Sequence, residues 1–283
     1  MNKEDRDGIV WLASYPKSGN TWFRAFLTAL TSGGEPDINS MDTDGIFSGK
    51  NHLEAVLDMN ADYLDFRQIE RFQRIAFTHL AETSKRPLFI KIHDAFTFSE
   101  TDGQPLIPEN CSRQGIYFVR NPLDVTLSLV NHLGKPVDRV IEKLITNKEA
   151  TFLPQKITPN SQFHQPLGTW SMHVESWLKY PSFPVHIMRY EDMKEKPFET
   201  FSKAVEALGL EAGPEQIRCA IENTRFEKLQ KKEEEAGFRE KQIPSSRFFF
   251  KGQSGRWKEE LTGEQIEKIR KINEPMMRRF GYW

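Results

Sequence analysis

Short apolar runs alternate with longer helical patterns along this chain. Ile9–Ala13 is a run of five apolar residues, long enough for one buried strand, and Leu88–His93 and Gly115–Val119 have the same character. Val185–Tyr190 is a further predicted strand, and Ile75–Phe77 is a weaker one. Because strands that alternate with helices favour a parallel sheet, the pattern predicts an α/β fold in one domain.

Helices are predicted between these strands by their period and their end signals. Asn121 is a suitable N-cap, Pro122 occupies the first helical position, and Gly134 and Pro136 stop the helix, which therefore covers 122–133. The other predicted helices cover Thr21–Leu30, 168–178, Pro197–Leu208, Pro214–Asn223, Phe226–Gly237 and Thr262–Phe280.

The stretch Ser14–Trp22 joins the first predicted strand to the first predicted helix. A strand, a small-residue loop and a helix present backbone N–H groups to an anion. Gly19 lets the backbone approach a ligand, Lys17 adds a mobile cation, and Ser18 and Thr21 add hydroxyls. In the loop of ATPases and GTPases the glycine precedes the lysine, whereas here the order is reversed. An ordinary strand–turn–helix corner therefore remains an alternative on the loop alone.

Length and charge limit the classes of partner. The chain has 283 residues and a net charge of −1, which disfavours a general nucleic-acid or membrane-surface binder. Cys111 and Cys219 are far apart, so neither a disulfide framework nor a Cys-based zinc site is expected. The first eight residues lack the apolar core of a signal peptide, and no run approaches the ~18 apolar residues of a membrane span. These observations predict a cytoplasmic protein without a metal site.

Polar side chains follow several predicted strands where ligands bind in open parallel sheets. Lys91 and His93 alternate along one strand and so share a face, Arg120 ends another, and Tyr190 ends a third. Taken singly, each has a structural alternative: a buried histidine, a surface salt bridge or a packed corner. Their joint position beside the Ser14–Trp22 loop favours a single binding site.

These residues and motifs resemble the nucleotide-dependent sulfotransferases, which use 3′-phosphoadenosine-5′-phosphosulfate (PAPS). Tyr15–Trp22 resembles the family's 5′-phosphosulfate loop, usually Y-P-K-S-G-T-T-W, and Arg120–Ser128 resembles its 3′-phosphate motif. Lys91 and His93 match the family's K-x-H. Further segments match in the family's order, namely 168–174, Tyr190–Met193, Thr224–Phe226 and Lys251–Lys258.

The resemblance implies a fold, a co-substrate and a reaction. The fold would be one sulfotransferase domain over residues 1–283, with a P-loop-kinase-like parallel sheet flanked by helices. PAPS would be the co-substrate and PAP the product, with no metal. The reaction would move the sulfuryl group to a hydroxyl of a small-molecule acceptor. A kinase with a variant phosphate loop and a non-catalytic nucleotide-binding protein are the alternatives; the pairing of Lys17 with His93 disfavours the second of these.

The resemblance also implies roles for individual residues. His93 would be the general base, Lys17 would stabilise charge on the bridging oxygen of the leaving nucleotide, and Lys91 would assist at the transferring group. Ser128 would contact the 3′-phosphate and restrain Lys17, while Arg120 would pair with that phosphate. The other residues implied to bind the nucleotide are Ser18, Gly19, Asn20, Thr21, Trp22, Tyr190, Thr224, Phe226, Phe250, Lys251 and Gly252.

Four positions depart from the family pattern: Asn20 replaces a common Thr, Arg256 stands where Asp is usual, and Phe250 and Gly263 replace an Arg and a Val. Phe250 stands where the family usually has Arg, which removes a cation from the 3′-phosphate site, and we hypothesise that Arg256 or Arg247 restores it. Two solvated arginines are the alternative. Lys258–Glu267 resembles the family's dimer motif, but Gly263 takes the place of its Val, which leaves a family-type homodimer in doubt.

The acceptor is expected to face the least family-like segments, 33–66, 146–167 and 233–249. Within the last, Glu233–Glu235 is interpreted as a solvated helix face. Aromatic side chains suit an aromatic or extended acceptor, although ordinary packing explains any one of them equally well. The candidates are Phe47, Tyr63, Phe66, Phe96, Phe152, Phe163 and Phe238.

Overall fold

The computed structural model describes residues 8–41, 43–152, 162–241 and 247–283. Residues 1–7, and parts of the three segments expected to face the acceptor, lie outside these ranges. Among the helices of the described ranges, none is both long and apolar enough to cross a membrane.

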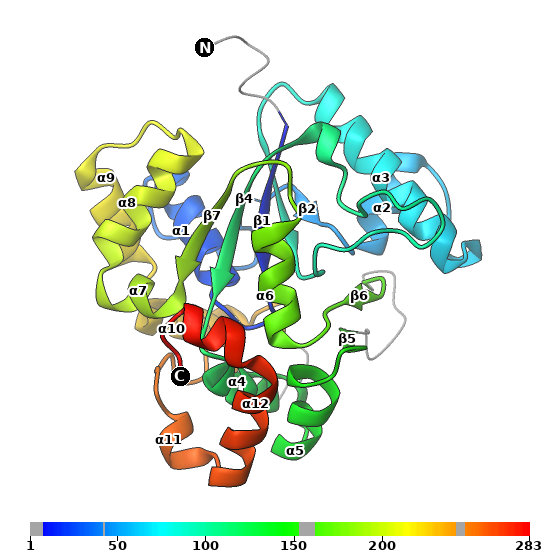
Figure 1. Cartoon of the computed structure of the whole chain (residues 1–283). Coiled ribbons are helices and arrows are strands. Elements are labelled where there is room, and N and C mark those ends of the chain that lie inside the picture. Colours follow the sequence, from blue (N-terminus) through cyan, green and yellow to red (C-terminus); the bar gives the residue numbers. More distant parts are fainter. Residues whose placement is uncertain (1–7, 42, 153–161, 242–246) are drawn as a thin grey trace.

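A parallel sheet forms the centre of the molecule, with the strand order β2-β3-β1-β4-β7 (Figure 1). All four neighbouring pairs are parallel. The prediction of an α/β fold with a parallel sheet is therefore confirmed, and so are its four stronger strands. The strands are β1 (Ile9–Ser14), β2 (Gly45–Ile46), β3 (Leu88–Ile92), β4 (Ser112–Val119) and β7 (Val185–Arg189).

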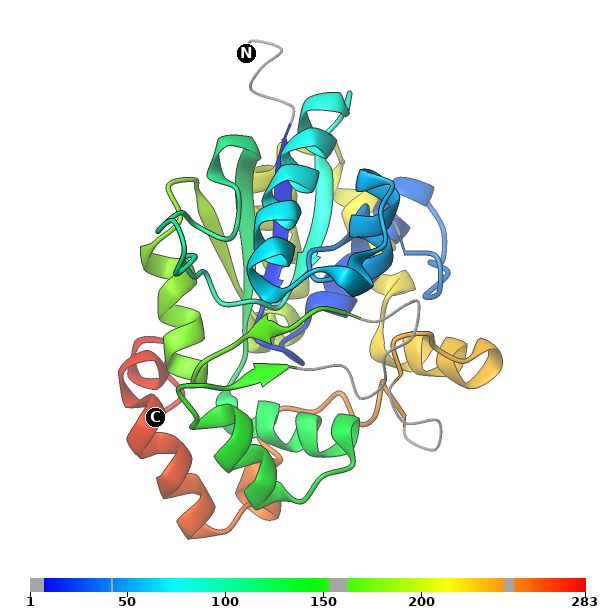
Figure 2. The same ribbon diagram turned by 90° about the vertical axis from the view of Figure 1, so that its right-hand side faces the viewer.

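Helices cover both faces of the sheet, because side chains along a strand alternate between its faces. On one face Trp11 of β1 packs edge-on against Phe77, and on the other Val10 and Leu12 join the cluster that contains Phe23. Figure 2 shows α3 lying across the first face. That face is covered by α3 (Phe66–Thr83) and α6 (Trp170–Lys179), and α12 (Gly263–Arg279) packs against α6. The opposite face is covered by α1 (Asn20–Ser32), α8 (Pro197–Leu208) and α9 (Pro214–Asn223).

The predicted weak strand at Ile75–Phe77 is wrong, because these residues lie inside α3. Asp65 and Gln68 form a capping box at the start of this helix. Phe77 and Ala81, four residues apart, are both buried, whereas Ile75 is 45% exposed. This is the burial pattern of an amphipathic helix. The edge of the sheet is formed instead by the two-residue strand β2.

Most of the remaining elements lie near the carboxyl edge of the sheet, whereas η3 precedes β4 at the opposite edge. The predicted helix over 122–133 is confirmed as α4 (Pro122–Leu133), with Asn121 as its N-cap. β5 (Thr151–Phe152) and β6 (Gln165–Pro166) form a small antiparallel pair. The other helices are α2 (Lys50–Leu57), α5 (Val137–Val140), α7 (Tyr190–Glu195), α10 (Phe226–Ala236) and α11 (Trp257–Glu260), with short turns η2 (Ala61–Tyr63), η3 (Glu109–Cys111) and η4 (Ile141–Ile145).

Candidate active site

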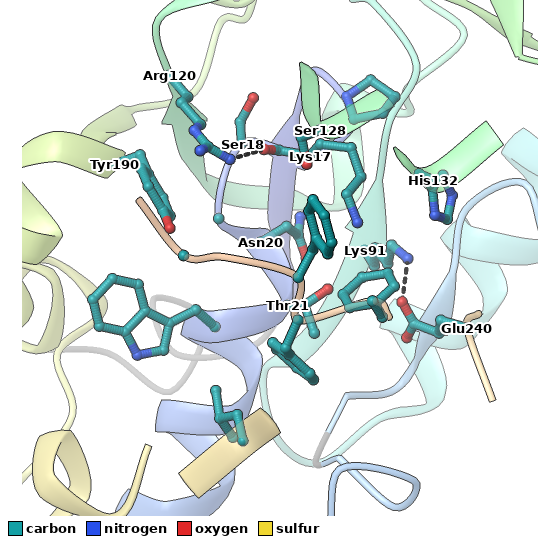
Figure 3. A pocket seen from close by; sticks show the side chains of 18 of the residues that line it. Lys17, Ser18, Asn20, Thr21, Lys91, Arg120, Ser128, His132, Tyr190 and Glu240 are labelled. Atoms are coloured by element: carbon teal, nitrogen blue, oxygen red, sulfur yellow. Dashed lines mark hydrogen bonds and ion pairs between the residues drawn. The ribbon is translucent and has the colours of Figure 1, made fainter. Parts of the chain in front are cut away.

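The carboxyl ends of β1, β3, β4 and β7 open into a cavity of about 1190 Å³. Lys17, His93, Arg120 and Tyr190, each just beyond a different strand, all line it. In Figure 3, Arg120 and Tyr190 lie on one side of Lys17, and Lys91 lies on the other. This separation follows from the strand order, in which β3 and β4 flank β1.

Every residue that the sequence analysis assigned to the site lines this cavity. They come from all parts of the chain: the four strand ends, the β1–α1 loop, one turn of α4, and the two C-terminal segments 224–226 and 250–252. These residues are Lys17, Ser18, Gly19, Asn20, Thr21, Trp22, Lys91, His93, Arg120, Ser128, Tyr190, Thr224, Phe226, Phe250, Lys251 and Gly252.

The loop between β1 and α1 has an unusual backbone. Lys17 has φ of 72° and Gly19 has φ of 111°, both in the left-handed region. A Cβ at Gly19 would lie 3.0 Å from the Tyr190 ring, so the loop needs glycine there for two reasons. Asn20 donates from its side chain to the Leu12 carbonyl at 2.7 Å, which fixes the helix start to the strand. The loop is therefore a rigid corner.

Lys17 forms no ion pair with any residue that the structure describes. Its ammonium lies 3.5 Å from the centre of the Phe248 ring, a cation–π contact. Burial, and then the positive charge of Arg120, lower the pKa of Lys17 to about 7. A bound anion would favour the protonated form. Ser128 lines the same cavity and lies near Lys17 in Figure 3.

Arg120 connects the β1–α1 loop to the C-terminal segment around Gln253. Its guanidinium donates to the Lys17 carbonyl and to the Gln253 carbonyl, both at 3.2 Å. It also stacks over the Tyr190 ring, 4.1 Å from the ring centre. Among the described residues, Nε of Arg120 has no hydrogen-bond partner although it is buried. The protein thus fixes the orientation of the Arg120 guanidinium and leaves its Nε–H as a donor for a ligand.

The C-terminal segment approaches α10 at Gly252. Gly252 has φ of 57°, and a Cβ there would lie 2.4 Å from the Phe226 ring, so only glycine fits. The Gly252 carbonyl accepts a hydrogen bond from Lys194. Beside it, the buried Nε1 of Trp22 has no partner within the described residues. Thr224 donates its hydroxyl to the Ala220 carbonyl at 2.8 Å, so it helps to end α9.

His93 has a defined tautomer. Its Nδ1 lies 2.9 Å from the Ser14 carbonyl oxygen, which can only accept, so Nδ1 carries the proton. The other ring nitrogen, Nε2, then carries a lone pair. Burial, and then the charge of Lys91, hold the pKa of His93 well below its ordinary value. His93 is therefore a neutral imidazole at neutral pH, in the state that a general base requires.

A buried hydrogen-bond chain fixes the backbone of His93. Nε2 of His173 donates to the His93 carbonyl at 2.9 Å, and Nδ1 of His173 accepts from the Tyr117 hydroxyl at 2.8 Å. Burial lowers the pKa of His173 to about 4 and raises that of Tyr117, so both stay neutral and the chain keeps this direction. The sequence places His173 only within the matching segment 168–174 and does not predict that it supports His93.

We expect His173→Phe to slow turnover by about 10- to 100-fold with little change in nucleotide affinity. The variant leaves the His93 carbonyl without its donor, and small displacements of a reacting group are costly. Steady-state kinetics, together with calorimetric titration of PAP, separates the two effects. His173→Gln, whose amide can still donate, should retain more activity. Equal losses in affinity and turnover, or no loss at all, would contradict this function of His173.

Lys91 is part of a buried ion triad that the sequence did not predict. Its ammonium lies 2.9 Å from one oxygen of Glu240, and the other oxygen lies 2.7 Å from the Arg24 guanidinium. Side-chain exposures are 7% for Lys91, 14% for Glu240 and 1% for Arg24. Figure 3 shows the Lys91–Glu240 contact. In the sequence, residues 238–256 are basic and aromatic, and Glu240 is the one acidic residue among them. This isolated charge was the only sign in the sequence that Glu240 has a buried cationic partner.

Most of the aromatic residues proposed to face the acceptor lie elsewhere. Phe47 and Phe96 are buried in the core, and Tyr63 is 87% exposed. Phe238 is buried among the rings of Phe248 and Phe249. Of the seven candidates, the one among the cavity-lining residues is Phe152. Apolar character alone could not distinguish packing in the core from contact with a ligand.

The interpretation of Glu233–Glu235 as a solvated face is wrong for Glu233. This carboxylate is 5% exposed and accepts from the backbone N–H groups of Phe248 and Phe249, at 2.6 and 2.8 Å. It is buried because it satisfies two backbone donors. Glu233 therefore fixes the segment that carries Phe248, the partner of Lys17, onto α10.

The cavity is strongly basic. Of the described residues that line it, two are acidic, Glu227 and Glu240, whereas ten are Lys or Arg. Six of the ten are ion-paired with acidic residues within the described ranges, which leaves four cations without an ion pair there, so a ligand with several negative charges suits this cavity. The ten are Lys17, Lys50, Lys91, Arg120, Lys194, Arg225, Arg239, Lys241, Lys251 and Arg256.

Comparisons with known proteins agree with this chemistry. A model of the sulfotransferase domain matches residues 7–281. Flavonol 3-sulfotransferase of Flaveria bidentis is 26% identical over 277 residues, which cover 93% of this chain and 80% of that protein. Sulfotransferase 1B1 of Canis lupus familiaris is 26% identical over 284 residues, 93% of this chain and 81% of that protein. The crystal structure of mouse sulfotransferase SULT7A1 complexed with PAP has a similar fold, with a TM-score of 0.59 at 20% identity over 96% of this chain and 85% of that chain.

Proposed function

This chain belongs to the sulfotransferase family, and we propose that it transfers the sulfuryl group of PAPS to a hydroxyl of a small-molecule acceptor. One observation carries the assignment of roles. Lys17 and His93 follow adjacent parallel strands and line one cavity, and His93 has its Nδ1 proton engaged by the Ser14 carbonyl. A cation for the leaving group and a base for the acceptor thus lie at one edge of the sheet.

The described residues fit a doubly phosphorylated nucleotide. Ser18 Oγ, Trp22 Nε1 and Arg120 Nε are buried polar atoms without a partner within the described ranges, and all three residues line the basic cavity. Buried donors in this state indicate a ligand that accepts hydrogen bonds. Arg120 and Ser128 would hold the 3′-phosphate, and the β1–α1 loop would hold the 5′ end.

The reaction needs one proton acceptor and one site of charge neutralisation. PAPS, when bound, supplies an activated sulfuryl group on a nucleotide leaving group. His93 would remove the proton from the acceptor hydroxyl through Nε2, as the oxygen forms its bond to sulfur. Lys17 would neutralise the charge that develops on the leaving oxygen, and Lys91 would do so at the transferring group. Because Lys17 and His93 follow adjacent strands and line one cavity, the leaving nucleotide and the acceptor could bind next to each other, as an in-line transfer requires.

The proposal is tested by turnover without metal. The full chain is incubated with PAPS and a panel of alcohols and phenols in EDTA, and PAP release and sulfated product are measured. We expect both products in equal amounts. A kinase would instead require ATP and added magnesium. The proposal fails if no acceptor is sulfated and calorimetry shows no binding of PAP.

Arg256 is the better candidate for the cation missing at Phe250. Its guanidinium lies 5.5 Å from the Phe250 ring centre, lines the cavity and is paired with Glu260, at 2.6 Å. Arg247 is 55% exposed, is paired with Glu234 and is absent from the lining residues. This arrangement supports Arg256 as a contact of the 3′-phosphate.

We expect Arg256→Ala to weaken binding of PAP by about tenfold, because a hydrogen bond between charged groups contributes about 1.5–3 kcal/mol. Arg247→Ala is the matched control and should bind PAP as the wild type does. Titration calorimetry of both variants measures the effect. If the two variants bind PAP equally well, Arg256 does not replace the missing cation.

A further inference from the structure

The cavity extends beyond His93, past β3 towards the β2 edge of the sheet. The residues that would hold the nucleotide follow β1, β4 and β7, so this opposite side, next to the base, is the place for the acceptor. We call it the acceptor end. It is lined by Ile46, residues 49–52, His132, Phe152, Gln162, Gln165 and Glu240.

Glu240 places a carboxylate at the acceptor end, next to the transfer site. Each of its oxygens accepts from one cation, Arg24 or Lys91, and a carboxylate can accept about four hydrogen bonds. The ion triad also fixes the orientation of the carboxylate. Glu240 can therefore accept hydrogen bonds from the hydroxyl groups of a ligand without losing its cationic partners.

His132 adds a second polar group. It lies one turn after Ser128 on α4, so both side chains face the cavity. Its ring stands edge-on to Phe248, 5.8 Å between centres, and stacks on Phe152 at 6.4 Å. Burial, and then the charge of Lys17, lower the pKa of His132 to about 3, so the neutral ring offers one donor and one acceptor.

Gln165 has an unsatisfied acceptor. It is 1% exposed, its amide group donates to Gln162 at 2.7 Å, and its Oε1 has no partner among the described residues. A buried acceptor in this state requires a donor from water or from a ligand. A hydroxyl group at the acceptor end would supply it.

We propose that the acceptor is an uncharged molecule with several hydroxyl groups, of the polyol or sugar type, and that Glu240 and His132 select it. This inference rests on the proposed function. The rings of Phe152 and Phe248 give an apolar surface for the carbon skeleton, while the carboxylate, imidazole and amide groups bind neighbouring hydroxyls. One hydroxyl is then left to face His93.

Other acceptor classes fit less well. A flat apolar phenol would leave Oε1 of Gln165 without a donor and would use neither Glu240 nor His132, and an unpaired buried polar group is costly. A cationic acceptor would meet a carboxylate whose charge Arg24 and Lys91 already offset.

The test compares acceptors that share a ring. myo-Inositol and cyclohexanol are both six-membered-ring alcohols, and methyl α-glucoside, phenol and a steroid alcohol extend the comparison. We expect kcat/KM for the polyols to exceed that for cyclohexanol and phenol by at least about tenfold. Calorimetry should show the preferred polyol, and not cyclohexanol, binding to the enzyme–PAP complex, where no transfer occurs.

Two variants then test the selecting residues. Glu240→Gln and His132→Phe should each raise KM for the preferred polyol about tenfold and change KM for cyclohexanol less than twofold. An effect transmitted through Lys91 would lower kcat for both acceptors alike. The ratio of kcat/KM for the polyol to that for cyclohexanol therefore reports only the contribution of these residues to acceptor selection. Tyr63→Ala is the matched control, because Tyr63 is 87% exposed and lies outside the lining residues.

The possible results are distinguishable. Preferred sulfation of cyclohexanol, phenol or the steroid alcohol overturns the polyol inference and leaves the proposed function intact, because each of these acceptors is a hydroxyl compound. Unchanged acceptor ratios in both variants overturn the selecting function of Glu240 and His132. If no acceptor is sulfated and PAP does not bind, the proposed function itself fails, and the inference fails with it.

Discussion

The His93→Ala variant is expected to lose between about 10² and 10⁴ of its turnover while it still binds PAP. His93 donates from Nδ1 to the Ser14 carbonyl, so its Nε2 is the atom free to accept a proton. The nucleotide contacts proposed above come from the other side of Lys17 and would be left in place. The measurement pairs steady-state kinetics with calorimetric titration of PAP.

The pH dependence adds an independent readout for His93. A base acts only when it is unprotonated, and the pKa of His93 is held well below its ordinary value by burial and by Lys91. Wild-type kcat should therefore stay level as the pH falls from 7 to 6, a range over which an unperturbed histidine, with a pKa of about 6.5, changes from mostly neutral to mostly protonated. His79→Ala, at an exposed position outside the cavity, is the control. Normal turnover by His93→Ala would exclude this residue as the base.

The sequence was sufficient for features that depend on local pattern. The strand at Ile9–Ser14, the loop that follows it and helix α4 each carry their own signals, namely an apolar run, small residues and an Asn-Pro start. Because parallel strands end at the same edge of a sheet, residues at their tips could be brought together without coordinates. All sixteen predicted site residues accordingly line one cavity.

Features that depend on long-range pairing were missed. Glu240 meets Lys91 across 149 positions and Arg24 across 216, and no period or motif marks either contact. The same is true of the Tyr117–His173 chain behind His93, because each hydrogen bond joins a different pair of elements. The sequence shows which side chains can carry a charge or a proton. It does not show which buried neighbours determine the protonation states of Lys91, Glu240 and His173.

Amphipathic patterns gave the clearest errors. Ile75–Phe77 was read as a strand because three apolar residues in a row fit either structure, and only the longer period of α3 decides for a helix. Glu233 was read as solvated because it stands in a run of three acids. Its burial depends on two backbone N–H groups about 15 positions later, which no helical pattern contains.

Replacing Lys17 with Met is expected to lower kcat by about 10²–10³, the effect of removing one preorganised group that stabilises transition-state charge. Met is also unbranched and only one atom shorter than Lys, so it can still pack beside the Phe248 ring while the charge is lost. PAP affinity should fall less than kcat, because Arg120 and the loop N–H groups remain. Lys17→Arg is the matched variant: it keeps a charge that does not titrate below pH 12.

The titration of Lys17 gives this prediction its sharpest form. Its pKa is about 7 in the free protein, and a bound nucleotide favours the ammonium, so the pKa is higher in the complex. Affinity for PAP is then complete below pH 7 and falls as the pH rises above it, by up to about tenfold per unit. Calorimetric titrations from pH 7 to 9 should show this slope in the wild type and a clearly smaller one in both Lys17→Met and Lys17→Arg, in which residue 17 does not titrate. If Lys17→Met retains the wild-type slope, another group is responsible, and Lys17 does not meet the nucleotide as proposed.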